Sequence, residues 1–137
     1  ERDDLRAAID WIEKEFPHLP LVVGGFSFGS MVGLSVGAED DRVIGLLGLG
    51  LPVNLDERYD YGYLTHVAKP VLVVQGENDE FGSGQQVAQS LSPLGSHVTV
   101  VRVPDSDHYF DGKLAELRTA VRGYYDSGPG ARLLATI

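Results

Sequence analysis

The sequence contains no cysteine. Disulfides, catalysis by a thiolate and cysteine-based zinc sites are therefore excluded. Positive charge is also scarce, because 11 Lys and Arg residues stand against 20 Asp and Glu residues and leave a formal net charge of -9. Binding to nucleic acid or to an anionic membrane needs clustered Lys and Arg, so we expect neither as a partner.

Long hydrophobic runs are missing as well, because Asp and Glu interrupt the chain throughout. No segment therefore predicts a membrane span. A chain of 137 residues with 43% hydrophobic content is long enough for one domain with a core of its own. We expect a soluble, cytoplasmic protein with one domain over residues 1–126 and a tail over residues 127–137.

The sequence does contain a hydrophobic run that is followed by a serine with glycines on both sides of it. The pentapeptide Gly25-Phe26-Ser27-Phe28-Gly29 matches the pattern G-x-S-x-G. It follows an apolar run typical of a buried strand and precedes a run of small and apolar residues typical of a helix, which is the context of a strained nucleophile turn. We expect glycine to be needed on both sides of Ser27, because such a turn leaves no room for a Cβ atom.

Helical and strand patterns alternate along the chain. The predicted helices cover residues 1–16, 28–36, 85–91 and 111–125, and the predicted strands cover residues 21–24, 43–49, 71–74 and 97–103. Residues 52–69 are predicted to form a loop with at most a short helix. This alternation predicts an α/β fold, with a mostly parallel sheet, right-handed crossovers and flanking helices.

The histidines can be sorted by their place relative to the predicted strands. A serine hydroxyl needs a base of near-neutral pKa, and catalytic groups in such sheets gather at the carboxyl ends of the strands. His18, His66 and His97 each precede a predicted strand or open it, so we expect them at the amino end. His108 follows the last predicted strand and is the histidine expected to meet Ser27.

The third member of the site is expected to be a carboxylate that accepts the ring N–H of His108 and stabilises the imidazolium. Asp79 follows the third predicted strand, and the turn after Gly76 is complete before its side chain points back over the sheet. Asp79 is therefore our first choice. Four other carboxylates after the same strand or the preceding one remain alternatives: Glu77, Glu80, Asp56 and Glu57.

The chain order serine, acid, histidine is the order found in α/β-hydrolases. Three segments carry a wider resemblance, namely residues 24–30, 73–79 and 107–114. Over nearly its whole length the chain resembles the α/β-hydrolase superfamily, and within it the small members without a large cap, similar to dienelactone-hydrolase-like serine hydrolases. Dienelactone hydrolases carry a cysteine nucleophile, and because this chain has Ser27 instead, their substrate is not carried over.

The resemblance also implies N-terminal strands that these residues lack. In the family three or four further strands precede the first helix, and a loop among them supplies one of two oxyanion-hole N–H groups. The other donor is the backbone N–H after the nucleophile, which is that of Phe28. Losing one such donor costs about 3 kcal/mol of transition-state stabilisation, so we expect poor activity from a chain that truly begins at Glu1.

Without those strands, the predicted strand over residues 21–24 is a flat apolar edge, which folded proteins avoid. We therefore expect a preceding segment or another chain to cover it. Self-association through this edge is one way to do so.

Together the motif and the resemblance predict a serine hydrolase, a carboxylesterase that acts on small acyl esters through an acyl-enzyme and without a cofactor. The short connection over residues 52–69 leaves no room for a large cap and favours an open site, whose mouth Tyr59, Tyr61 and Tyr63 would line unless they only pack. The alternative is a non-catalytic module or fragment of the fold that binds a partner through the sheet edge.

Two other patterns carry less weight. Gly24, Gly29 and Ser30 are spaced as in a phosphate-binding loop, but the lysine that must reach the phosphates is missing. Asp105, Asp107 and His108 are potential metal ligands, but no further ligands follow at metal spacing, so we expect no metal.

Overall fold

The computed structural model describes residues 1–55 and 60–135. Its helices are α1 (Arg2–Glu15), α2 (Phe28–Glu39), α3 (Gly84–Leu91), α4 (Leu114–Asp126) and α5 (Ala131–Leu134), with short 3-10 helices η1 (Gly62–His66) and η2 (Ser92–Leu94). Its strands are β1 (Leu21–Phe26), β2 (Val43–Leu49), β3 (Val71–Gly76) and β4 (Val98–Val103).

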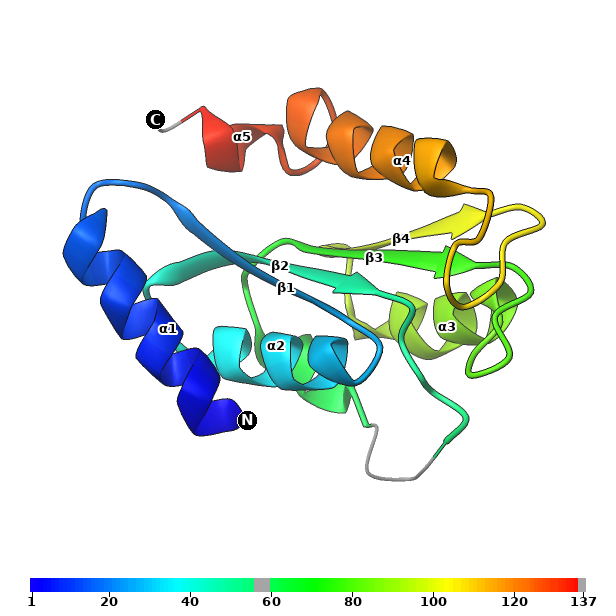
Figure 1. Ribbon diagram of the computed structural model, residues 1–137, viewed down its shortest axis with the longest axis horizontal. Coiled ribbons are helices and arrows are strands. Elements are labelled where there is room, and N and C mark those ends of the chain that lie inside the picture. Colours follow the sequence, from blue (N-terminus) through cyan, green and yellow to red (C-terminus); the bar gives the residue numbers. More distant parts are fainter. Residues whose placement is uncertain (56–59, 136–137) are drawn as a thin grey trace.

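The described strands form one sheet in the order β1-β2-β3-β4, and every neighbouring pair is parallel. Helices α4 and α5 lie on one face of this sheet, and α1, α2 and α3 lie on the other (Figure 1). The prediction of an α/β fold with a parallel sheet between helices is therefore confirmed. Because strand order follows chain order, β1 lies at one edge of the sheet and β4 at the other.

The sheet separates two hydrophobic clusters. The larger one joins Ile9 of α1, Leu34 of α2 and Val87 of α3 to the strands, and each of these side chains is almost fully buried. The smaller one joins Phe110 and Tyr124 to the opposite face of the sheet. β3 is buried on both faces along its whole length, as expected for a central parallel strand.

Two predicted helix boundaries are wrong by three residues. The helix predicted to end at residue 36 continues to Glu39. The helix predicted from residue 111 begins only at Leu114. Phe110 and Gly112, with φ angles of 53° and 67°, have left-handed backbone conformations that a right-handed helix cannot include.

The residues predicted as a tail contain α5. A Cβ atom at Gly45 of β2 would lie 2.7 Å from Leu133 Cδ1, so this short helix lies directly against the sheet. The predicted domain boundary after residue 126 stays a prediction. Within the part of the chain that the structure describes, no helix combines the length and the apolar character that a membrane crossing needs.

Candidate active site

Ser27 lies at the turn from β1 into α2. Its N–H donates to the Leu49 carbonyl at 2.9 Å, which extends the pairing of β1 with β2 by one residue. Its carbonyl accepts from the Ser30 N–H at 2.9 Å, which closes the first turn of α2. Between these bonds Ser27 has φ 53° and ψ -122°, a conformation that costs a non-glycine residue about 1–3 kcal/mol. The turn predicted from the motif is therefore present, and its backbone is strained.

The two glycines of the pentapeptide are not equivalent. A Cβ atom at Gly25 would lie 2.0 Å from the Gly29 carbonyl oxygen, so glycine is required there. A Cβ atom at Gly29 would meet nothing within 4 Å among the described residues. The prediction that the turn needs glycine on both sides of Ser27 is wrong for Gly29. The backbone of Gly29 lies close to the Cβ position of Gly25, but the Cβ position of Gly29 itself is open.

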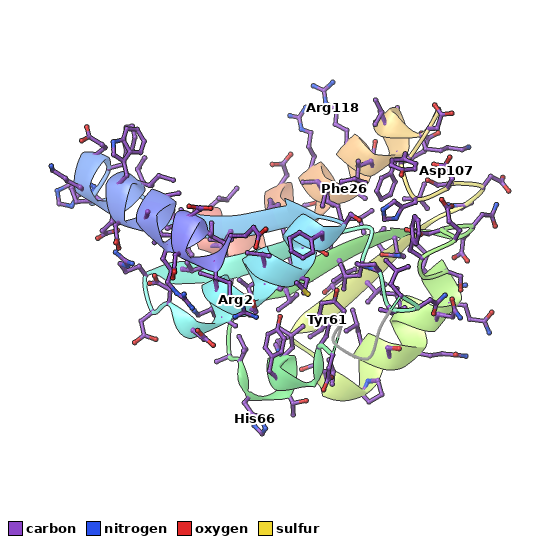
Figure 2. All side chains as sticks on the ribbon, turned by 60° about the horizontal axis from the view of Figure 1, so that its bottom comes forward. Arg2, Phe26, Tyr61, His66, Asp107 and Arg118 are labelled. Atoms are coloured by element: carbon purple, nitrogen blue, oxygen red, sulfur yellow. The ribbon has the colours of Figure 1, made fainter. Side chains whose placement is uncertain are left out.

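His108 is brought to Ser27 by the loop after β4. Its Nε2 lies 2.9 Å from Ser27 Oγ, and its side chain is almost completely buried. Asp107 shapes the loop by accepting from the N–H groups of Tyr109 (3.0 Å) and Asp111 (3.1 Å). Figure 2 shows Phe26 and Asp107, the residues before Ser27 and His108, on one side of the molecule and His66 far from them.

The histidines that were predicted at the amino ends of the strands are there. His18 precedes β1, His66 ends η1 before β3, and His97 precedes β4. The His97 ring nitrogen Nε2 lies 2.8 Å from the Leu64 carbonyl oxygen, which it bonds instead of facing Ser27. Of the four histidines only His108 contacts the serine.

Asp79 completes a chain of side chains behind Ser27. Its Oδ2 lies 2.8 Å from His108 Nδ1, and its other oxygen accepts from the Phe81 N–H at 2.8 Å. A buried carboxylate bound in this way orients the imidazole and stabilises its protonated form. Gly76 makes the approach possible, because a Cβ atom there would lie 2.5 Å from the Ser106 carbonyl oxygen in the histidine loop.

The described alternatives to Asp79 point elsewhere. Glu77 pairs with Arg102 of β4, with Oε2 accepting from the guanidinium at 2.9 Å, and this bond holds the pKa of Glu77 below its ordinary value. Glu80 is exposed to solvent. Asp56 and Glu57 lie outside the described residues.

Gln75 belongs to this site and was not predicted from the sequence. It is completely buried, and its Nε2 donates to Asp79 Oδ2 at 3.1 Å. The available signal was a single amide in the otherwise apolar strand Val71–Gly76. Such a residue needs internal partners, since burying an unpaired amide is costly.

Aromatic rings surround His108. The ring centroids of Phe26, Phe81 and Tyr109 lie 5.1, 4.7 and 5.1 Å from that of the imidazole. The tyrosines predicted to line the mouth or to pack are placed differently: Tyr61 is buried in the larger core cluster, Tyr63 packs against it, and Tyr59 lies outside the described residues.

Phe28 is the first residue of α2. Its N–H can have no acceptor within the helix, because the first turn of an α-helix leaves its N–H groups free, and the helix dipole adds partial positive charge there. This N–H is available to a developing oxyanion beside Ser27. Residues 1–55 and 60–135 contain no cluster of three His, Asp or Glu side chains that could hold a metal ion.

Comparisons with known proteins agree with this architecture. A family model described as an alpha/beta hydrolase domain matches residues 2–122. The chain is similar to an alpha-beta serine hydrolase homologue from Coxiella burnetii, with 32% identity and a TM-score of 0.78, over 89% of this chain and 57% of that one. It is also similar to a serine hydrolase without a lid from Xanthomonas campestris, with 34% identity and a TM-score of 0.76, over 91% and 55%.

An uncharacterized protein from Rickettsia prowazekii is 26% identical over 127 residues, which are 88% of this chain and 53% of that protein. The chain thus spans a little over half the length of each of these three relatives. The family model covers most of the chain, from α1 into α4, and includes Ser27, Asp79 and His108. The chain belongs to the α/β-hydrolase family.

Proposed function

We propose that this protein is a serine hydrolase and that Ser27, His108 and Asp79 are its catalytic residues. The observation that carries the proposal is the continuous pair of hydrogen bonds, 2.9 Å from His108 Nε2 to Ser27 Oγ and 2.8 Å from His108 Nδ1 to Asp79 Oδ2. This arrangement gives a weak nucleophile an adjacent base and gives that base an orienting carboxylate.

The reaction follows from these contacts. Ser27 Oγ attacks the acyl carbon while His108 Nε2 takes its proton, and Asp79 stabilises the imidazolium that forms. The carbonyl oxygen becomes an oxyanion and accepts from the Phe28 N–H. His108 then returns the proton to the leaving group, which departs and leaves Ser27 acylated. Water, deprotonated by His108, attacks the acyl carbon. His108 then returns this proton to Ser27 Oγ as the bond between Oγ and the acyl carbon breaks, which releases the acid and free Ser27.

Two relatives support this proposal. The proteins from Coxiella burnetii and Xanthomonas campestris, both more than 30% identical to this chain, are described as serine hydrolases or homologues of them. The second is described as lacking a lid. A lidless site agrees with the short connection from β2 to β3, which has no room for a large cap.

We propose carboxylic esters with small acyl groups as substrates. An alcohol leaving group needs less help from a proton donor than an amine does, so an ester is the substrate for which this set of groups is sufficient. Whether thioesters or amides also react is decided by the pocket and not by the triad.

A fluorophosphonate probe tests the proposal on the native polypeptide at full length. The probe phosphonylates an activated serine with loss of fluoride, so we expect labelling of the wild type and none of Ser27→Ala. Ser90→Ala, which removes an exposed serine from α3, is the matched control and should label normally.

Hydrolysis of a series of p-nitrophenyl esters of increasing acyl length, from acetate upward, tests the substrate class in the same proteins. Labelling that persists in Ser27→Ala would contradict the role of Ser27. A wild type that neither labels nor hydrolyses any ester would support the alternative, a non-catalytic module of the fold.

A further inference from the structure

Gln75 is the penultimate residue of β3 and is completely shielded from solvent. The strand around it is apolar, with Val71, Leu72, Val73 and Val74 all fully buried. A buried amide among such residues is destabilising unless its polar atoms are bonded. The side-chain amide of Gln75 therefore needs hydrogen-bond partners inside the protein.

The amide is bonded on both of its polar atoms. Its Oε1 accepts from the Leu51 N–H at 2.8 Å. Its Nε2 faces three acceptors: the Leu51 carbonyl at 3.1 Å, the Gly82 carbonyl at 2.6 Å and Asp79 Oδ2 at 3.1 Å. Because three acceptors surround the nitrogen and an N–H meets the oxygen, only one orientation of the amide satisfies the site.

These partners come from different segments. Leu51 lies in the connection after β2, and Gly82 lies beyond Asp79 in the connection after β3. The two segments touch, since a Cβ atom at Gly82 would lie 2.9 Å from the Leu51 carbonyl oxygen. One side chain of the central strand thus links both connections to the carboxylate.

The hydrogen bond from Gln75 to Asp79 is made to Oδ2, the carboxylate oxygen that also faces His108. Asp79 Oδ2 accepts from Gln75 Nε2 and also lies 2.8 Å from His108 Nδ1, while Oδ1 is taken by the Phe81 N–H. Gln75 and Phe81 together hold the carboxylate in one plane and one direction. Without the amide, Asp79 Oδ2 would lose one of its two partners and keep only its bond to His108.

We propose that Gln75 is a positioning residue, which orients Asp79 and through it His108 while tying the connection after β2 to the connection after β3. The proposal rests on the proposed hydrolase function and goes beyond it, because neither the sequence motif nor the triad geometry assigns a role to position 75. Gln75 touches no reacting atom and acts only through Asp79.

Gln75→Met tests the proposal with little change of volume. We expect kcat for a p-nitrophenyl ester to fall by about 10- to 100-fold with KM nearly unchanged, because the lost bond misplaces His108 and does not touch the substrate. The low-field proton resonance of His108 Nδ1–H bonded to a carboxylate should weaken or vanish. An unchanged kcat together with an unchanged resonance would overturn the proposal.

Gln75→Glu is the second variant and decides the matter if Gln75→Met does not fold. The titratable groups bonded in this network are Asp79 and His108, and the new carboxyl would face Asp79 and two carbonyl oxygens. We therefore expect the pKa of this new carboxyl to be raised, since its ionised form would find no hydrogen-bond donor beside Asp79 and the two carbonyl oxygens. We expect kcat/KM of the Gln75→Glu variant to fall at the pH where position 75 ionises, a loss that the wild type does not show.

Gln85→Glu is the charge-matched control, because Gln85 is an exposed residue of α3. It should keep the wild-type pH profile, and a Gln75→Glu profile that matches it would overturn the proposal. Failure of the proposed function has a different signature. A wild type without esterase activity or probe labelling removes the hydrolase, while the His108 resonance still reports whether Gln75 orients Asp79 and His108.

Discussion

The backbone strain at Ser27 is maintained by its immediate neighbours. The first turn of α2 packs closely against Gly25, because this residue has no Cβ atom. A Cβ atom there would lie 2.0 Å from the Gly29 carbonyl oxygen and 2.7 Å from the Ser30 nitrogen. Both of these are backbone atoms that cannot rotate away. The turn at Ser27 therefore depends on one glycine of the pentapeptide far more than on the other.

Gly25→Ala and Gly29→Ala form a matched pair that tests this difference. We expect Gly25→Ala to lower the free energy of unfolding by about 3 kcal/mol or more, because backbone has to move, and to lose labelling by the probe. Gly29→Ala should leave the free energy of unfolding unchanged or raise it by up to about 1 kcal/mol. Urea unfolding measures both, and equal losses in the two variants would contradict the prediction.

Asp79 and Glu77 are two carboxylates on one connection with different partners. Asp79→Asn should lower kcat by about 10⁴-fold, because an amide at this position favours the wrong tautomer of His108. Glu77→Gln should keep the wild-type rate, because Glu77 pairs with Arg102 on the surface. Steady-state ester hydrolysis separates the two, and the reverse result would move the acid role to Glu77.

At the scale of elements, the end of α2 is held by a residue far away in the sequence. The Lys69 ammonium donates to the carbonyl oxygens of Gly37 (2.7 Å), Ala38 (3.3 Å) and Asp40 (2.6 Å). A cation at this end of a helix satisfies free carbonyls and complements the helix dipole. Partial burial lowers the pKa of Lys69, so these bonds must compensate for lost hydration.

Lys69→Met should therefore lower the free energy of unfolding by about 1.5–3 kcal/mol, the range for hydrogen bonds to a charged group. Probe labelling of Ser27 should persist, because Ser27 lies at the opposite end of α2. Lys14→Met, at an exposed position of α1, is the control and should change stability little. A loss as large in the control would show that Lys69 acts only through net charge.

At the scale of the whole molecule, two arginines join separate elements through carboxylates. Arg42 bonds Asp40 at 2.7 Å and Asp10 of α1 at 2.8 Å, and Arg102 of β4 bonds Glu77 beyond β3. The pKa of Asp40 is lowered chiefly by its hydrogen bond to Arg42, and that of Glu77 by its hydrogen bond to Arg102.

A carboxyl with a lowered pKa binds fewer protons in the folded state than in the unfolded one, so it stabilises the fold above its ordinary pKa. Those ordinary values are 3.8 for Asp40 and 4.5 for Glu77. The stabilisation is lost as the pH falls from these values through the lowered pKa of each folded-state group. Exposure of the pairs to water keeps each contribution small.

We therefore expect the double variant Asp40→Asn, Glu77→Gln to be less stable than the wild type at pH 7, with a difference that shrinks as the pH falls below 4. Urea midpoints at a series of pH values measure this difference. Glu116→Gln, which removes an exposed carboxylate from α4, serves as the control. A difference that stays constant with pH would contradict the assigned ion pairs.

The sequence by itself determined the alternation of helices and strands and the candidates Ser27, Asp79 and His108. It could do so because apolar runs mark buried strands, and the carboxyl ends of parallel strands meet at one edge of a sheet. Chain order then left one histidine in reach of the serine. Whether Asp79 or Glu77 accepts the imidazole could not be decided in this way, because both follow the same strand.

Tertiary structure decided what depends on atoms from distant segments. The Arg102 guanidinium draws Glu77 to the surface and leaves Asp79 to His108, and three carbonyl and carboxylate oxygens from two connections give Gln75 its role. The glycines around Ser27 look alike in the pentapeptide and differ only in what lies beside their Cβ positions. Such differences depend on close contacts between segments that no local pattern relates to one another.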